Sequence, residues 1–150
     1  MKLSQRFSVE PLPYLNDTTP TRARVLMDGQ PSACIVDGEL LEAAIEWEDK
    51  FVLILSDGVI WEEGLNIHLL GPDLQPVDSL SMGWPYTPGL FGDLHLYAPD
   101  RFEFSFPGPT RWRVRLLSKR RLAMPSLDWF NGISRPLSLW RRLELVCLGD

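Results

Sequence analysis

Histidine is the usual general base near neutral pH, and the chain contains two histidines, His68 and His95. His95 stands in the spacing Asp93-x-His95-x-Tyr97. Alternate residues of a β-strand point to the same face, so a strand over this segment would place three titratable side chains together. Such a face could support acid–base chemistry, with His68 contributing from an opposite strand.

Other signals of catalysis are missing from the sequence. There is no GxSxG, no HExxH, no glycine-rich phosphate loop and no EF-hand. The adjacent carboxylates Glu62 and Glu63 would point to opposite faces of a strand. No third ligand stands at a diagnostic spacing, so we expect no metal and no other cofactor. We therefore expect a protein that is not an enzyme. The alternative is a small hydrolase or ligand-binding β-barrel that uses His95, Asp93 and Tyr97.

Charge is distributed unevenly along a chain whose net charge is −5. Residues 1–110 carry 6 lysines and arginines against 17 carboxylates, whereas residues 111–150 carry 9 against 3. Within residues 37–63, nine carboxylates face a single lysine. Two interpretations stay open: separate acidic and basic surfaces, or neutralisation between adjacent strands.

The basic segment begins with three arginines, Arg111, Arg113 and Arg115, that alternate with apolar residues. This pattern predicts a strand with the arginines on one face. Arginines with an interleaved aromatic residue can bind nucleic acid. Trp112, however, alternates to the opposite face and is expected in the core, and a net charge of −5 repels a polyanion. We expect no nucleic-acid binding.

The acidic segment favours a protein partner, because complementary charge steers association and suppresses wrong partners. Glu42, Glu46 and Glu48 alternate along a predicted strand, so we expect them to share one face and to confront basic residues of the partner. Trp61 and Glu62 lie in the same segment and are further candidates for contact.

An aromatic loop over residues 83–89 offers two more candidate contacts, Trp84 and Tyr86. Aromatic side chains dominate the binding energy of many interfaces, and Pro85 and Pro88 would hold these two at low entropic cost. The alternative is that the loop covers one end of the sheet.

Proline and glycine divide the sequence into short apolar segments every 8–12 residues, a spacing typical of all-β proteins. Leu40 to Glu48 alternates and is expected to form a strand, whereas Phe51–Leu55 is apolar on both faces, as a central strand would be. Helix is expected only as a single turn at Ser126–Phe130, with Ser126 as its cap. We expect an antiparallel sandwich, or a strongly curved barrel-like sheet, of about nine or ten strands with little helix.

The 150 residues suit one domain, 1–150, with enough apolar material for a core. The longest apolar run is far shorter than the ~20 residues of a membrane-spanning helix. Residues 1–7 are too polar for a secretory signal, so we expect a cytoplasmic protein without membrane contact. Cys34 and Cys147 have apolar neighbours and are expected to be buried free thiols.

Segments from Trp61 to Leu70, Val77 to Gly83 and Tyr86 to Gly89, followed by Phe104–Phe106 and Trp112–Val114, resemble a group of small uncharacterised bacterial proteins. The chain is also similar in kind to compact acidic immunity proteins, which protect bacteria from toxins delivered by competitors. The resemblance covers roughly residues 33–117 and has no defining motif. It implies a protein partner and assigns no residue.

Taken together, the residues and the resemblance lead us to expect a cytoplasmic protein-binding module of the immunity-protein kind. It would inhibit an antagonistic bacterial toxin by covering its active site, and the toxin domain would present a basic surface. A further possibility is that the chain is one subunit of a larger assembly, in which the apolar segment near the C-terminus adds a strand to a partner's sheet.

Overall fold

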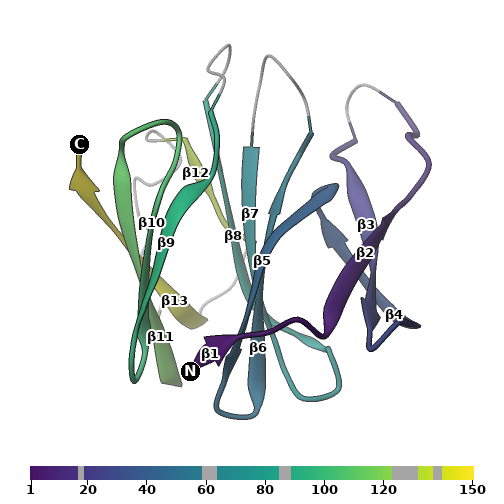
Figure 1. The fold of residues 1–150 in the computed structure, drawn as a ribbon, viewed down its shortest axis with the longest axis horizontal. Helices are drawn as coiled ribbons and strands as arrows, with labels where there is room; N and C mark the ends of the chain where they lie inside the picture. Colours follow the sequence, from purple (N-terminus) through teal and green to yellow (C-terminus); the bar gives the residue numbers. More distant parts are fainter. Residues whose placement is uncertain (17–18, 59–63, 85–88, 123–131, 137–139) are drawn as a thin grey trace.

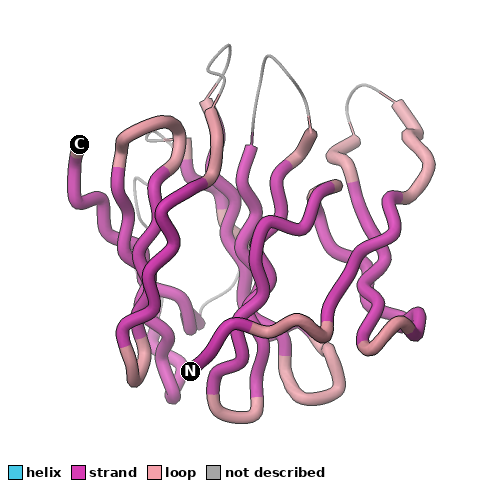
Figure 2. The backbone as a smooth tube through the Cα atoms, in the orientation of Figure 1, coloured by secondary structure: helices cyan, strands magenta, loops and turns pink. Residues whose placement is uncertain are grey.

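The computed structural model describes residues 1–16, 19–58, 64–84, 89–122, 132–136 and 140–150. These residues form 13 strands, all paired antiparallel, in three sheets. Figure 2 shows strands and loops and no helix in this part of the chain. The all-β prediction is confirmed. The described residues accordingly include no helix long and apolar enough to cross a membrane.

A six-stranded sheet forms the middle layer (Figure 1). Its central strands are buried on both faces, because their residues are apolar at nearly every position; Val52, Leu53, Ile54 and Leu55 are all fully buried. In spatial order the strands are β1 (Lys2–Leu3), β5 (Leu40–Trp47), β6 (Lys50–Ser56), β7 (Gly64–Leu70), β8 (Pro76–Gly83) and β12 (Ile133–Ser134).

A four-stranded sheet covers one face of the middle layer, at the left in Figure 1. Phe102 and Phe104 alternate inward from one of its strands, and Trp112 and Val114 do so from the next, which builds a shared core with the middle sheet. In spatial order its strands are β13 (Trp140–Gly149), β11 (Arg111–Leu122), β10 (Arg101–Ser105) and β9 (Gly92–Tyr97).

A three-stranded sheet covers the other face of the middle layer, at the right in Figure 1. It consists of β2 (Phe7–Pro11), β3 (Arg22–Met27) and β4 (Gln30–Asp37) in that order. Asp28 and Gly29 join β3 to β4 with φ values of 54° and 79°. Two consecutive positive φ angles are the signature of a two-residue type I′ turn, which suits the right-handed twist of a hairpin.

The middle and four-stranded sheets are bridged along one side by Asp78 of β8. Its Oδ2 atom accepts hydrogen bonds from the backbone N–H groups of Arg142 and Leu143 in β13, at 2.7 and 3.0 Å. On the opposite side of these two sheets, Trp47 at the end of β5 donates a hydrogen bond from Nε1 to the carbonyl of Pro99, between β9 and β10, at 3.0 Å. The two sheets thus form a sandwich, and the sheet order of the described residues gives no closed barrel.

The structure corrects several details of the sequence prediction. The strand count exceeds nine or ten, partly because the short β1, β2 and β12 carry too few alternating residues to be seen as strands, and a third layer was not anticipated. Cys147 is exposed, not buried, while Cys34 is half-buried, and both are free thiols. The predicted helical turn at Ser126–Phe130 lies outside the described residues.

Candidate functional site

The three glutamates predicted to form one acidic face contact three different parts of the chain. Glu42 Oε1 accepts a hydrogen bond from Ser56 Oγ of β6 at 2.8 Å. Glu46 Oε1 lies 3.9 Å from Arg6 Nη1, and Glu48 Oε1 accepts a hydrogen bond from Ser118 Oγ of β11 at 2.7 Å. The predicted common face is therefore wrong.

A β-bulge explains why the glutamates separate. The register between β5 and β6 shifts between Leu41 and Ala43. As a result Leu41 packs toward the three-stranded sheet, whereas Ala43, two residues later, packs toward the four-stranded sheet. One extra residue reverses the alternation of a strand, so Glu42 and Glu46 no longer share a side.

Trp84 packs against the core and acts mainly as a cover. It is half-buried, its ring stacks on Trp112 with centroids 6.2 Å apart, and it lies 6.4 Å from the ring of Phe106. Much of its surface is thus already used inside the molecule. The other predicted contact residues Trp61, Glu62 and Tyr86 lie outside the described residues.

The side chains predicted to share a face around His95 are exposed, but a register shift between Glu103 and Ser105 of the paired strand interrupts the alternation beside Asp93. Asp93, His95 and Tyr97 are all exposed and alternate with half-buried residues of β9. Asp93 has a φ of 51°, and its Oδ2 atom accepts a long hydrogen bond of 3.4 Å from Ser105 Oγ. In the paired strand β10, His95 stands opposite Glu103.

The two histidines do not face each other, which corrects the prediction of a joint site. His68 belongs to β7 of the middle sheet and is 8% exposed, and its Nε2 atom lies 2.9 Å from the carbonyl of Asp37 in β4. It therefore lies between the middle and three-stranded layers, whereas His95 belongs to the sheet on the other side. Burial lowers the pKa of His68, and the carbonyl and charge of Asp37 oppose this shift.

Metal ligation finds no support in the described part of the chain. No group of three or more histidine, cysteine, aspartate or glutamate side chains there could hold an ion. The exposed face of β9 therefore offers a histidine beside acidic neighbours but no assembled metal site.

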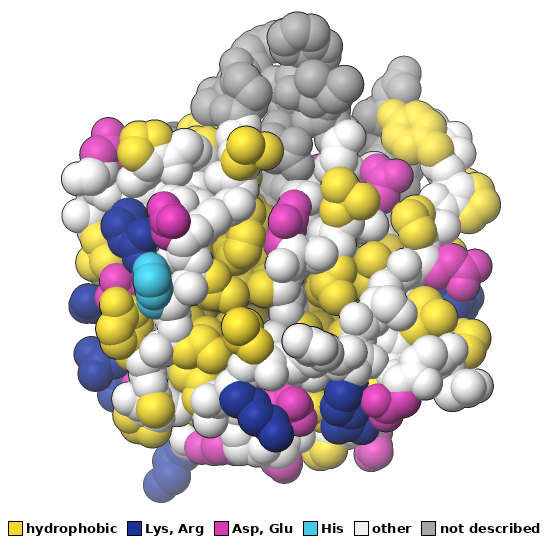
Figure 3. All heavy atoms as spheres, viewed as in Figure 1, with side chains coloured by type: hydrophobic (Ala, Val, Ile, Leu, Met, Phe, Trp, Pro, Cys, Tyr) yellow, Lys and Arg dark blue, Asp and Glu magenta, His cyan; other side chains and the backbone are white. Residues whose placement is uncertain are grey.

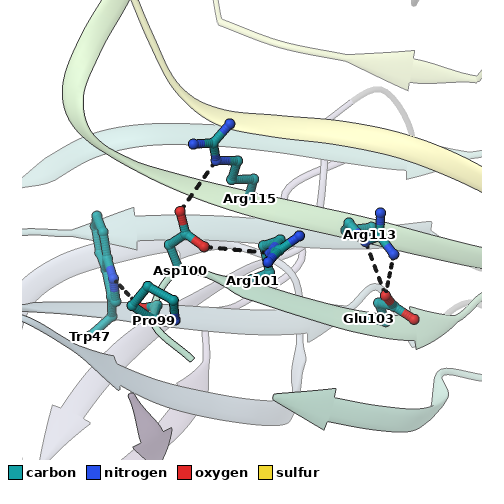
Figure 4. A network of polar contacts seen from close by, with 7 residues as sticks. All are labelled: Trp47, Pro99, Asp100, Arg101, Glu103, Arg113 and Arg115. Carbon is teal, nitrogen blue, oxygen red and sulfur yellow. Dashed lines mark hydrogen bonds and ion pairs between the residues drawn. The ribbon is translucent and has the colours of Figure 1, made fainter. Parts of the chain in front are cut away.

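Three arginines of the basic strand β11 contact carboxylates of its neighbour β10 and of the turn that precedes β10 (Figure 4). Arg113 donates two hydrogen bonds to Glu103, at 3.0 and 2.9 Å, and Arg115 donates one to Asp100 at 3.2 Å. Arg111 lies 3.7 Å from the same Glu103. Partly exposed pairs of this kind contribute only about 0.2–1 kcal/mol each, so their main consequence is that part of the positive charge is locally balanced.

The prediction that Trp112 is a core residue is confirmed. Trp112 is 6% exposed, and its Nε1 atom donates a hydrogen bond to the carbonyl of Phe106 at 2.7 Å. Trp112 therefore offers no stacking platform on the polar face of this strand. Near the end of β11, Arg120 lies over the ring of Trp140, with its Cζ atom 4.7 Å from the ring centroid, so the expectation about nucleic acid stays a prediction.

Three carboxylates gather where β4 ends, where β5 begins and where β6 ends: Asp37, Glu39 and Asp57. We call them the acidic rim. Among the described residues, none of the three has a lysine or arginine nitrogen within 4.0 Å; Arg22 stands opposite Asp37 in the β3–β4 ladder without reaching it. The three carboxylates of the acidic rim therefore stand without a direct ion pair in the described part of the chain.

Asp57 is a half-buried member of the acidic rim. Burial raises the pKa of its carboxyl, a hydrogen bond from Asn66 Nδ2 to Oδ1 at 2.6 Å lowers it, and the charges of Asp37 and Glu39 raise it again. Like-charged neighbours are expected to raise the pKa of a carboxyl, and a cation that approached the acidic rim would lower it again.

Sequence reasoning counted the rim residues within the acidic segment but did not single them out. The available signal was their position: Asp37 and Asp57 each precede a glycine at a turn, so both belong at strand ends. Whether these strand ends lie close together depends on how the three-stranded sheet packs on the middle sheet. That packing cannot be predicted from the local sequence pattern.

Comparisons with known proteins assign no family. A scan against protein-family models gave no match, and searches of curated proteins and of solved structures gave none either. Geometry and charge are therefore what support a function for this chain.

Proposed function

We propose that the chain is a protein-binding module that acts in the cytoplasm as an immunity protein. Its partner would be a bacterial antagonistic toxin with a basic surface, which it would inhibit by covering the toxin's active site. The acidic rim carries this proposal, because Asp37, Glu39 and Asp57 form a negative surface without a direct ion pair among the described residues.

The rim suits electrostatic recognition for two reasons. Complementary fields raise association rates and favour the correct partner. The rim is also held in place: the Glu39 N–H donates to the Ser56 carbonyl at 2.8 Å, and the Asp57 N–H donates to the Gly64 carbonyl at 3.0 Å. A fixed charged surface loses less entropy on binding than a mobile one.

Inhibition by occlusion requires only that the bound domain blocks access to the toxin's substrate site. Enzymes that act on nucleic acids or other anions carry lysines and arginines around that site, and an acidic surface competes for the same residues. Glu42, next along β5 after the acidic rim, has no cationic partner among the described residues and would extend the negative surface.

The proposal is tested by protection in living cells. The tagged chain is used to capture its partner from its own host, and the partner is then produced in a sensitive strain with each variant. We expect the wild-type chain and the control Glu10→Lys to protect growth and Glu39→Lys to protect poorly, because the two variants change net charge equally at different places. Glu10 is exposed on β2. Full protection by Glu39→Lys would contradict a role for the acidic rim.

A further inference from the structure

An apolar hollow of about 390 Å³ lies between the middle and four-stranded sheets, on the side away from Asp78. Hydrophobic side chains gather in the hollows of this face (Figure 3). Five apolar residues of the lining come from β1, β5 and the region of β9: Leu3, Ala43, Ala44, Phe91 and Leu94. Leu3 is 57% exposed and Leu90, next to Phe91, is 83% exposed, which leaves apolar surface open to solvent.

Two strand edges border this hollow. Strand β9 is the last strand of its sheet and pairs with β10 alone in the described part of the chain. Strand β5 pairs with β6 on one side, and on the other side its only ladder partners are Lys2 and Leu3, opposite Glu46 and Ile45. Residues 40–43 of β5 therefore have no strand neighbour among the described residues on that side, and unpaired edges of this kind accept additional strands.

Strand β1 shows that the edge of β5 is able to pair. Its two residues lie antiparallel to β5, and the Ser4 N–H extends the contact by donating to the Ala44 carbonyl at 2.8 Å. After Ser4 the chain leaves for β2 on the opposite layer, and the pairing ends. An extended segment from another molecule could continue the same ladder along residues 40–43.

The charge of the hollow restricts what such a segment carries. The lining has two charged residues, Glu42 and Asp93, and both are acidic. Hydroxyl groups orient them: Ser56 Oγ donates to Glu42 and Ser105 Oγ to Asp93. Neither has a lysine or arginine nitrogen within 4.0 Å in the described part of the molecule. A basic side chain on the bound segment would provide the cation that both carboxylates lack.

We propose that this hollow binds an extended segment of the partner protein, which adds a strand to the free edge of β5, inserts apolar side chains between the sheets and presents a lysine or arginine to Glu42 and Asp93. The inference rests on the proposed function, since it names the part of the protein partner that is recognised. Backbone pairing would provide affinity, and alternate side chains would provide specificity. The acidic rim lies immediately before β5, so one basic partner could contact both surfaces.

The test uses a displayed library of random nine-residue peptides, selected on the purified wild-type chain. We expect selected peptides to alternate apolar residues and to carry lysine or arginine. Binding to Leu3→Arg and to Glu42→Lys should weaken about tenfold or more, because the first blocks the hollow and the second reverses its charge. Two control variants, Val146→Arg and Glu10→Lys, should bind normally, since Val146 is 51% exposed and lies on β13, outside the hollow, and Glu10 is exposed on β2.

A second readout examines the backbone directly. N-methylation of alternate amides in the best peptide should abolish binding in one register and preserve it in the other, because only alternate N–H groups of a strand face its neighbour. Equal loss in both registers would contradict strand addition.

Several results would overturn the inference. These are failure to enrich any peptide, enrichment of acidic peptides, or binding that Leu3→Arg leaves unchanged. Self-association of the wild-type chain that Leu3→Arg disrupts would assign the hollow to a second copy instead. If no peptide binds but Glu39→Lys still weakens binding of the whole partner, only this inference is contradicted. If Glu39→Lys also leaves binding of the whole partner unchanged, the proposed function is contradicted as well.

Discussion

At the scale of single residues, the interface between the middle and three-stranded sheets contains hydrogen-bonded polar groups. Asn66 is 4% exposed; its amide donates to Asp57 Oδ1 at 2.6 Å and accepts from Ser81 Oγ at 2.7 Å. His68 makes its bond to the Asp37 carbonyl nearby. Buried polar groups are tolerated when they are hydrogen-bonded, and these also fix the two strand ends that carry Asp37 and Asp57.

His68 should make stability depend on pH. Because its pKa is lowered in the folded state, the unfolded chain binds the proton more readily, and stability is lost as pH falls below the ordinary value of 6.5. We expect His68→Gln to lack this loss between about pH 7.5 and about pH 5, measured as the free energy of unfolding in urea. The exposed His95→Gln should behave like the wild type. The same fall in His68→Gln as in the wild type would contradict this assignment.

At the scale of elements, alternation predicted the strands whose two faces differ clearly. The inward phenylalanines of β10 and the alternating arginines of β11 were visible because each pattern repeats over several residues. Strand β2 was missed because only Phe7 of its five residues is buried, and β1 and β12 have two residues each.

The candidate site was less accessible to prediction than the fold. The bulge near Leu41 separates Glu42 from Glu46, and a bulge leaves no mark in a pattern of apolar and polar residues. The acidic rim and the apolar hollow both depend on contacts between sheets. Strand alternation fixes which residues face inward, but the packing of one sheet on another decides which strand ends and edges meet.

The bridge from β8 to β13 offers a test of how the sheets are joined. Asp78→Ala would leave two backbone N–H groups of β13 without their carboxylate acceptor, and we expect it to lower the free energy of unfolding by about 2 kcal/mol. Asp73→Ala, at an exposed turn, serves as the control and should change stability by less than about 0.5 kcal/mol. Equal stability of the two variants would show that β13 is held without Asp78.

At the scale of the whole molecule, charged side chains are arranged differently in the four-stranded sheet and along β5. In the four-stranded sheet, Glu103 and Asp100 balance part of the positive charge of β11 across adjacent strands. The acidic rim and the apolar hollow lie along β5 and lack such balance. The two interpretations of the charge asymmetry thus apply to separate parts: pairing across adjacent strands for the first arginines of β11, and an acidic surface near the start of β5.

The most direct test of this account is the affinity of the purified partner for the wild-type chain, measured by calorimetry between about 50 mM and about 500 mM sodium chloride. Electrostatic recognition predicts that the dissociation constant rises about tenfold or more over this range, and that Glu39→Lys weakens binding at low salt and flattens the dependence. A dissociation constant that stays the same at every salt concentration, and in Glu39→Lys, would contradict the central claim.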